Sequence, residues 1–190
     1  MVGLGNREIT PDALGPRVAD NMMITRHVIR EFGKYALGAE HSNLISSIVP
    51  GVMAQTGMES LEIIRGVIRE TEPDCIVAVD ALAARSVKRL NRTIQITNTG
   101  INPGSGVGNH RHGLNRESVG IPVIAIGVPT VVDAATIVND AISGYYEEVD
   151  CTLNSFFVTP KDIDESIKRL SFTISEGLNL AFEKTACTNS

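Results

Sequence analysis

The hydrophobic residues of the chain fall into short apolar runs that alternate with helical patterns. The runs that predict strands are Met1–Leu4, Leu44–Pro50, Cys75–Val79, Thr93–Thr97 and Ile121–Gly127. The third and fifth are almost unbroken, as expected for strands whose two faces are both covered by helices. The first is unusually short for a strand that opens a domain.

Between these runs, apolar residues recur at helical spacing. Thr10, followed by Pro11, is typical of a helix start, and Thr56 with Glu59 matches a capping box before the next helix. Further helices are predicted over Ala81–Leu90, from about Val131 to Tyr146, and from Thr159-Pro160 to Phe182. The alternation predicts a single α/β domain over residues 1–184, with three α/β/α layers and a mostly parallel sheet, followed by a polar tail at 185–190.

Composition and charge exclude several classes of protein. The formal net charge is −5, and acidic and basic residues are interspersed, which argues against a nucleic-acid-binding face. No apolar run reaches the roughly 18–20 residues of a membrane-spanning helix, and the N-terminus has no secretion-signal pattern. The three cysteines are far apart and form no CxxC pair, which indicates a reducing, cytoplasmic setting.

Two aspartates stand where α/β sheets place their sites, at the carboxyl ends of strands. Asp12 falls in the first turn of a predicted helix, and Asp80 directly follows the run Cys75–Val79. Both can project into one crevice, where a carboxylate pair sharing a proton serves as base and acid on a water. A structural reading stays open, because an aspartate in either position also complements a helix dipole or caps a helix.

The segment from Thr97 to Gly113 is rich in glycine but matches no nucleotide-binding fingerprint. Ser105 is not in a GxSxG elbow. His110 and His112 supply too few ligands for a metal site, and we interpret them as exposed loop residues. Cys75 is predicted to be buried in its strand, which argues against a nucleophilic role.

Four strings, taken together, resemble the spore germination protease family of endospore-forming bacteria. They are "GLGN…TPDALGP", "PGVMAQTG", "DALAARS…TIQITNTGINPGSGVGN" and "GIPVIAIGVPTVVDA", in this order. The resemblance runs from about Val2 to Phe182. It implies an atypical aspartic endopeptidase that degrades small acid-soluble spore proteins, with a fold related to hydrogenase maturation proteases but no need for their nickel.

The resemblance carries the catalytic aspartates of the family onto Asp12 and Asp80. It also implies that Gly106, Gly108 and Asn109 form a loop beside the cleft, where glycine lets a backbone approach closely. Asp133 is expected in the first turn of the helix after Gly127, in a supporting role. No metal and no cofactor are expected.

The resemblance further implies a homo-oligomer in the cytoplasm of the spore core, without membrane or nucleic-acid partners. Family members carry an N-terminal region with a propeptide that is removed on activation. We therefore expect this chain to lack an N-terminal segment, and its short first strand to leave a sheet edge open to self-association. Two alternative functions stay open: a non-catalytic peptide-binding or assembly relative, and a metal-binding protease of the maturation type.

Overall fold

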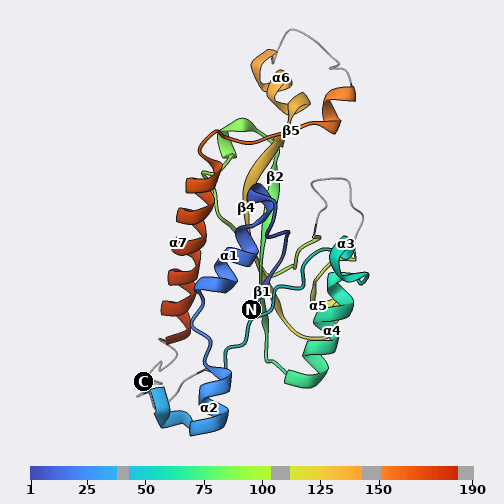
Figure 1. Ribbon diagram of the computed structural model, residues 1–190. Coiled ribbons are helices and arrows are strands. Elements are labelled where there is room, and N and C mark those ends of the chain that lie inside the picture. The colour runs from blue at the N-terminus through green and yellow to red at the C-terminus, as the bar shows by residue number, and fades with distance from the viewer. Residues whose placement is uncertain (38–42, 104–111, 143–150, 184–190) are drawn as a thin grey trace.

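A five-stranded sheet forms the centre of the computed structural model, which describes residues 1–37, 43–103, 112–142 and 151–183 (Figure 1). The strands are β1 (Val2–Gly3), β2 (Ile76–Ala84), β3 (Gln95–Thr97), β4 (Val123–Asp133) and β5 (Phe157–Val158). In the order β1-β2-β4-β3, the first three strands are parallel, and β3 and β5 each pair antiparallel with β4. The sheet is therefore mixed, with the parallel strands on one side and the antiparallel pairings at β4.

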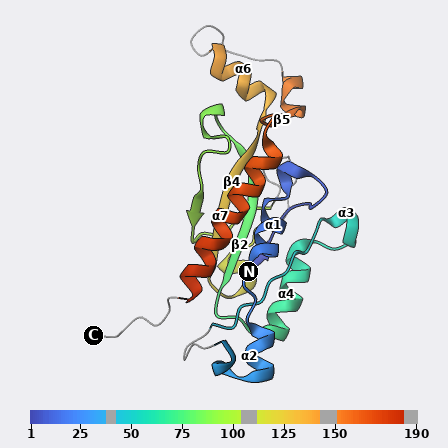
Figure 2. The ribbon, with the colours of Figure 1, turned by 60° about the vertical axis from the view of Figure 1, so that its left-hand side comes forward.

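One face of the sheet is covered by α1 (Leu14–Asn21) and α7 (Ile163–Glu183), which lie side by side along β2 and β4 (Figure 2). Both helices turn an apolar stripe inward, as their periodicity predicts. The buried core on this side consists of Leu14, Val18, Met22, Val77, Val79, Ile126, Val128, Ile163, Ile167 and Ile174. No helix in the described part of the chain is long and apolar enough to cross a membrane.

The opposite face is covered by α4 (Ser60–Thr71), with the short helices α3 (Met53–Thr56) and α5 (Arg116–Val119) on the same side (Figure 1). Its buried core consists of Val2, Leu4, Leu61, Ile64, Ile76, Ala78, Leu114 and Val123. Alternate residues of β2 thus enter the two cores. The predicted three-layer α/β/α fold is confirmed.

The remaining helices lie outside these layers. α2 (Arg26–Phe32) follows α1, and α6 (Ala134–Ile142) lies beyond the far end of β4, at the top of Figure 1. Single 3₁₀ turns occur at Thr10–Asp12, Lys34–Leu37, Val87–Arg89 and Cys151–Ser155. The first of them leads directly into α1.

Gly15 sets how closely α1 approaches the sheet. A Cβ atom at this position would lie 2.3 Å from the Leu4 carbonyl oxygen and 2.4 Å from that of Val79. Backbone atoms cannot move away from such a contact without disturbing both strands, so only glycine fits. The close approach fixes the start of α1, and the 3₁₀ turn before it, against the carboxyl ends of β1 and β2.

Both long strands extend further than the sequence predicts. β2 continues through Asp80 to Ala84, where a helix over Ala81–Leu90 is expected, and only Val87–Arg89 forms a 3₁₀ turn. β4 continues to Asp133, so the following helix begins three residues later than predicted. The two extensions pair with each other, so each strand provides hydrogen-bond partners for the added residues of the other. This pairing overrides the helix propensity of alanine and leucine.

Smaller differences concern ends and caps. Leu44–Pro50 contributes a single bridge, between Ile48 and Val2, instead of a strand. The capping box of α4 uses Glu59, whose amide donates to Glu62 Oε2 at 2.8 Å, instead of Thr56. Cys75 is exposed, because β2 begins one residue after it, so its predicted burial is wrong.

Candidate active site

Asp12 is held by the loop that joins β1 to α1. It ends the 3₁₀ turn Thr10–Asp12, and its Oδ2 accepts a hydrogen bond from the Asn6 amide at 2.6 Å. Gly5 makes this tight return of the chain, with φ of 113°, and a Cβ there would lie 2.0 Å from the Asp12 carbonyl oxygen. The carboxylate of Asp12 is half-buried and faces a cavity with its position fixed by backbone contacts.

Asp80 lies within β2, not after its end, and pairs with Gly127 of β4. Its side chain is only 3% exposed, and its Oδ1 accepts a hydrogen bond from the Ala81 amide at 2.9 Å. A Cβ at Gly127 would lie 2.4 Å from Leu82 Cδ1, so the glycine leaves room for Leu82 in this part of the pair. A buried carboxylate in a central strand is uncommon, which makes Asp80 a candidate functional residue.

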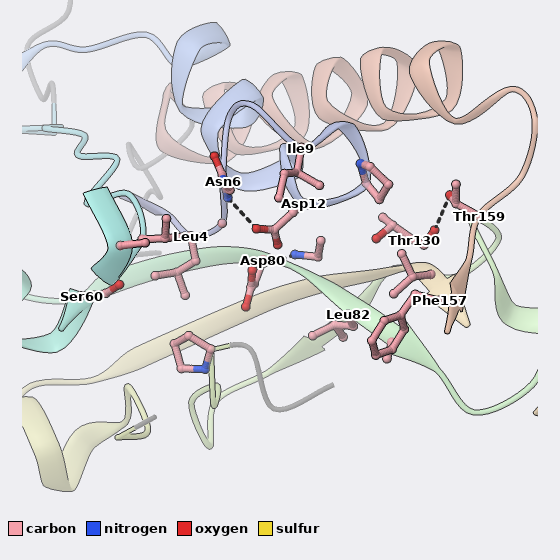
Figure 3. Close-up of a pocket in the computed structure, with 18 residues that line it drawn as sticks. Leu4, Asn6, Ile9, Asp12, Ser60, Asp80, Leu82, Thr130, Phe157 and Thr159 are labelled. Atoms are coloured by element: carbon pink, nitrogen blue, oxygen red, sulfur yellow. Dashed lines mark hydrogen bonds between the residues drawn. The ribbon is translucent and has the colours of Figure 1, made fainter. Parts of the chain in front are cut away.

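Both aspartates line one cavity of about 470 Å³ (Figure 3). Its apolar wall includes Leu4, Ile9, Val52, Leu82, Val131 and Phe157. Its polar side chains are those of Asn6, Asp12, Ser60, Asp80, Thr130 and Thr159. Phe157 of β5 is 41% exposed, so its ring borders the opening. A largely apolar cavity with a few converging polar groups is typical of a binding or catalytic site.

A second, more polar cavity of about 820 Å³ shares the wall formed by Asp80, Ala81, Leu82 and Ala83. Its charged side chains include Arg85, Arg89 and Asp133. Asp80 therefore lies where two neighbouring cavities meet.

Asp133 was expected in the first turn of the helix after Gly127, and this placement is wrong. It is the last residue of β4 and pairs with Phe157. It lines only the second cavity, away from Asp12. The structure thus places Asp12 and Asp80 in the wall of the same cavity, whereas Asp133 lines the neighbouring one.

Gly106, Gly108 and Asn109, like Ser105 and His110, lie outside the described residues. The residues just before them border the site, because Pro103 lines the first cavity and Asn102 the second. The base of the segment is closed by two hydrogen bonds between Ile101 and Leu114, at 2.8 and 2.9 Å.

His112 is not among the residues that line either cavity. It is exposed, as predicted, and its Nδ1 lies 2.8 Å from Glu59 Oε2. Among the described residues, no three histidine, cysteine, aspartate or glutamate side chains gather in a way that could hold a metal ion.

The sequence interpretation misses four polar residues of the first cavity, which are Asn6, Ser60, Thr130 and Thr159. Among them, Thr130 of β4 is completely buried. Pro129 is the signal that could have drawn attention to it, since proline inside a central strand is found at bulges.

The family model and the curated relatives that match this chain carry the same description. The family model described as "Germination protease" matches residues 1–149. Curated relatives called germination protease include one from Caldanaerobacter subterraneus, 44% identical over 96% of this chain and 65% of its own length. A Clostridium perfringens relative is 42% identical with the same coverage, and one from Bacillus velezensis is 56% identical over 75% of this chain and 38% of its own length. The chain thus spans about two thirds or less of these relatives.

Among solved structures, the chain is similar to a [NiFe] hydrogenase maturation protease, HycI, from Thermococcus kodakarensis. The match covers 92% of this chain and 88% of that one, with 19% sequence identity and a TM-score of 0.45.

Proposed function

Because the chain belongs to the germination protease family, we propose that it is the catalytic region of an endopeptidase that acts in spore germination. The observation that carries the proposal is the placement of Asp12 and Asp80, from segments far apart in the sequence, in the wall of one cavity. Both lie within the matched residues 1–149. The 3₁₀ turn before α1 and the central strand β2 supply one carboxylate each.

We propose that the two carboxylates share one proton and act on a water between them and the substrate. The ionised carboxylate takes a proton from the water, and the water oxygen bonds to the carbonyl carbon of the peptide bond. The protonated carboxyl donates a hydrogen bond to the carbonyl oxygen. When the C–N bond breaks, the leaving nitrogen takes up the proton removed from the water, which leaves a carboxylic acid and an amine and restores the dyad.

The proposed substrates are small acid-soluble spore proteins, cleaved in the cytoplasm of the spore core. We propose that the active form is a homo-oligomer produced by removal of a propeptide, in keeping with the family resemblance of the motifs. The two adjoining cavities support a polypeptide substrate, because they offer room on both sides of Asp80. No cofactor takes part in this mechanism.

The test is cleavage of a purified small acid-soluble spore protein by the chain and by the longest open reading frame that contains it. Asp12→Asn and Asp80→Asn should each abolish the appearance of fragments in mass spectra while the melting temperature stays close to that of the wild type. Asp74→Asn removes the same charge at an exposed position outside both cavities and should leave cleavage unchanged.

Cleavage that survives both cavity substitutions would contradict the dyad. Binding of the spore protein without cleavage by any form would favour the non-catalytic, peptide-binding alternative.

A further inference from the structure

The pairing of β2 with β4 is interrupted at one residue. Leu82 pairs with Pro129 and Ala83 pairs with Val131, so Thr130 is an extra residue without a partner on β2. This is a β-bulge, and it follows a proline that cannot donate to the ladder. Bulges beside active sites commonly redirect a side chain.

Thr130 is held firmly in this unusual position. Its residue exposure is 0%, and its carbonyl oxygen accepts a hydrogen bond from Thr159 Oγ1 at 2.9 Å. Figure 3 shows this bond and shows the Thr130 side chain directed toward the part of the cavity where Asp12 and Asp80 lie. The Thr159 hydroxyl therefore anchors the backbone at the bulge, while the Thr130 side chain projects toward the two aspartates.

The hydroxyl of Thr130 has no hydrogen-bond partner among the described residues. The other buried hydroxyls of that part of the chain do have partners, which are carbonyl or carboxylate oxygens. They belong to Thr25, Ser60, Ser166, Ser171 and Ser175. An unsatisfied buried hydroxyl destabilises a folded protein, so one that persists calls for an explanation, such as a bound group that supplies the acceptor.

Valine would fill the same space without this disadvantage, since it differs from threonine only by a methyl group in place of the hydroxyl. Three nearby positions of β4, at 128, 131 and 132, are indeed valines. The hydroxyl at 130 therefore contributes nothing to packing that valine would not. A ligand that supplies the missing acceptor explains its presence.

We propose that Thr130 is a substrate-binding residue whose hydroxyl donates a hydrogen bond to a main-chain carbonyl oxygen of the bound polypeptide. The proposal rests on the proposed peptidase function and adds a residue to it. Every peptide unit carries a carbonyl acceptor, so this contact suits substrates of varied sequence. Because the hydroxyl is withdrawn from bulk solvent, a hydrogen bond made there is stronger than one at an exposed site.

The test compares three variants in the longest open reading frame that contains the chain. Thr130→Val should lower kcat/KM for a small acid-soluble spore protein about 3- to 15-fold, mainly through KM, because one hydrogen bond to the substrate is lost. Its melting temperature should equal or exceed that of the wild type. Thr130→Ser keeps the hydroxyl and should stay within about twofold of wild-type kcat/KM.

Thr25→Val is the matched control. It removes a buried hydroxyl that donates to the Asn43 carbonyl, away from both cavities. This variant should lower the melting temperature and leave KM and kcat unchanged, which is the reverse of Thr130→Val. A Thr130→Val protein with wild-type KM and kcat, or with a lowered melting temperature, would overturn the proposal.

A binding measurement separates this proposal from the peptidase function. In the Asp80→Asn background, the dissociation constant of the spore protein should rise by a similar factor of about 3 to 15 when Thr130→Val is added. If the wild type fails to cleave, the peptidase proposal fails, and the dissociation constant still decides on Thr130. Equal constants with and without the substitution, or no binding at all, would count against it.

Discussion

The two halves of the β2–β4 pair differ in most of their local properties. From Ile76 to Val79, β2 pairs residue by residue with Val123–Ile126, and its side chains enter the two apolar cores. From Asp80 onward, the same pair carries a buried carboxylate, a proline and the bulge at Thr130. The first half combines regular pairing with buried apolar side chains and so stabilises the domain. The second half has irregular pairing and a buried charged residue, and it lines both cavities.

The largest effect on stability is expected in the regular half. Ile126 is 6% exposed, and Ile126→Ala should lower the free energy of unfolding by about 2–5 kcal/mol, because it leaves a cavity in the core. Ile124 lies two residues earlier and is 39% exposed, so Ile124→Ala should cost no more than about half of that. Urea titration measures both, and equal losses would contradict the assignment of the core.

A smaller effect is expected where the two halves meet. Gly127→Ala should destabilise the domain by about 1–3 kcal/mol, because the new Cβ would overlap Leu82 Cδ1. Adding Leu82→Ala should recover part of this loss, and a double-mutant cycle gives the coupling. As a control, Gly66→Ala in α4 meets no atom within 4 Å and should stabilise the protein by about 0.5–1 kcal/mol. Additive effects at positions 82 and 127 would show that the overlap is absent.

The support of the bulge should contribute less. Thr159→Val removes the hydrogen bond to the Thr130 carbonyl and should cost about 0.5–1.5 kcal/mol. Thr173→Val removes a hydroxyl that bonds the Arg169 carbonyl on the exposed side of α7, and should cost less than about 0.5 kcal/mol. Thermal unfolding compares the Thr159→Val and Thr173→Val variants. Indistinguishable melting temperatures would mean that the bulge does not depend on Thr159.

The smallest effect on stability is expected at Asp140, in helix α6 after the end of β4. Hydrogen bonds from the Val87 amide and the Ser86 hydroxyl, each 2.9 Å long, lower the pKa of Asp140. A folded-state pKa below the unfolded one stabilises the fold above the unfolded pKa, and this contribution disappears as the pH falls through the folded pKa. Asp140→Ala should therefore lower the melting temperature slightly at pH 7 and lose this effect in acid. A pH-independent difference would contradict the role of the charge.

The regular half of the pair is also the part that the sequence predicts well. Unbroken apolar runs locate Val77 and Val79 in a covered strand, and the long stripe of α7 predicts a helix that ends near Phe182. Both signals are strong because burial on a sheet face or along a helix repeats regularly. Topology also points to Asp12 and Asp80, since strand ends in such sheets converge. Both line one cavity, and their action as a catalytic dyad stays a prediction.

The irregular half is predicted poorly, for a physical reason. Asp80 interrupts the apolar run of β2 and is therefore taken for the end of the strand, while Ala81–Leu90 has the composition of a helix. What keeps this segment extended is its ladder with β4, which joins residues 47 or 48 positions apart and which no local pattern encodes. The bulge at Thr130 depends on the same register, so the sequence offers only the indirect signal of Pro129.

The position of Phe157 is suited to a fluorescent reporter of the first cavity. The chain contains no tryptophan, and the ring of Phe157 borders the cavity while remaining 41% exposed. A Phe157→Trp substitution would therefore introduce a single indole at the edge of the site, with space beside it for the larger ring. Its emission would respond to occupancy of the site, so that binding of an unlabelled polypeptide could be followed by fluorescence in real time.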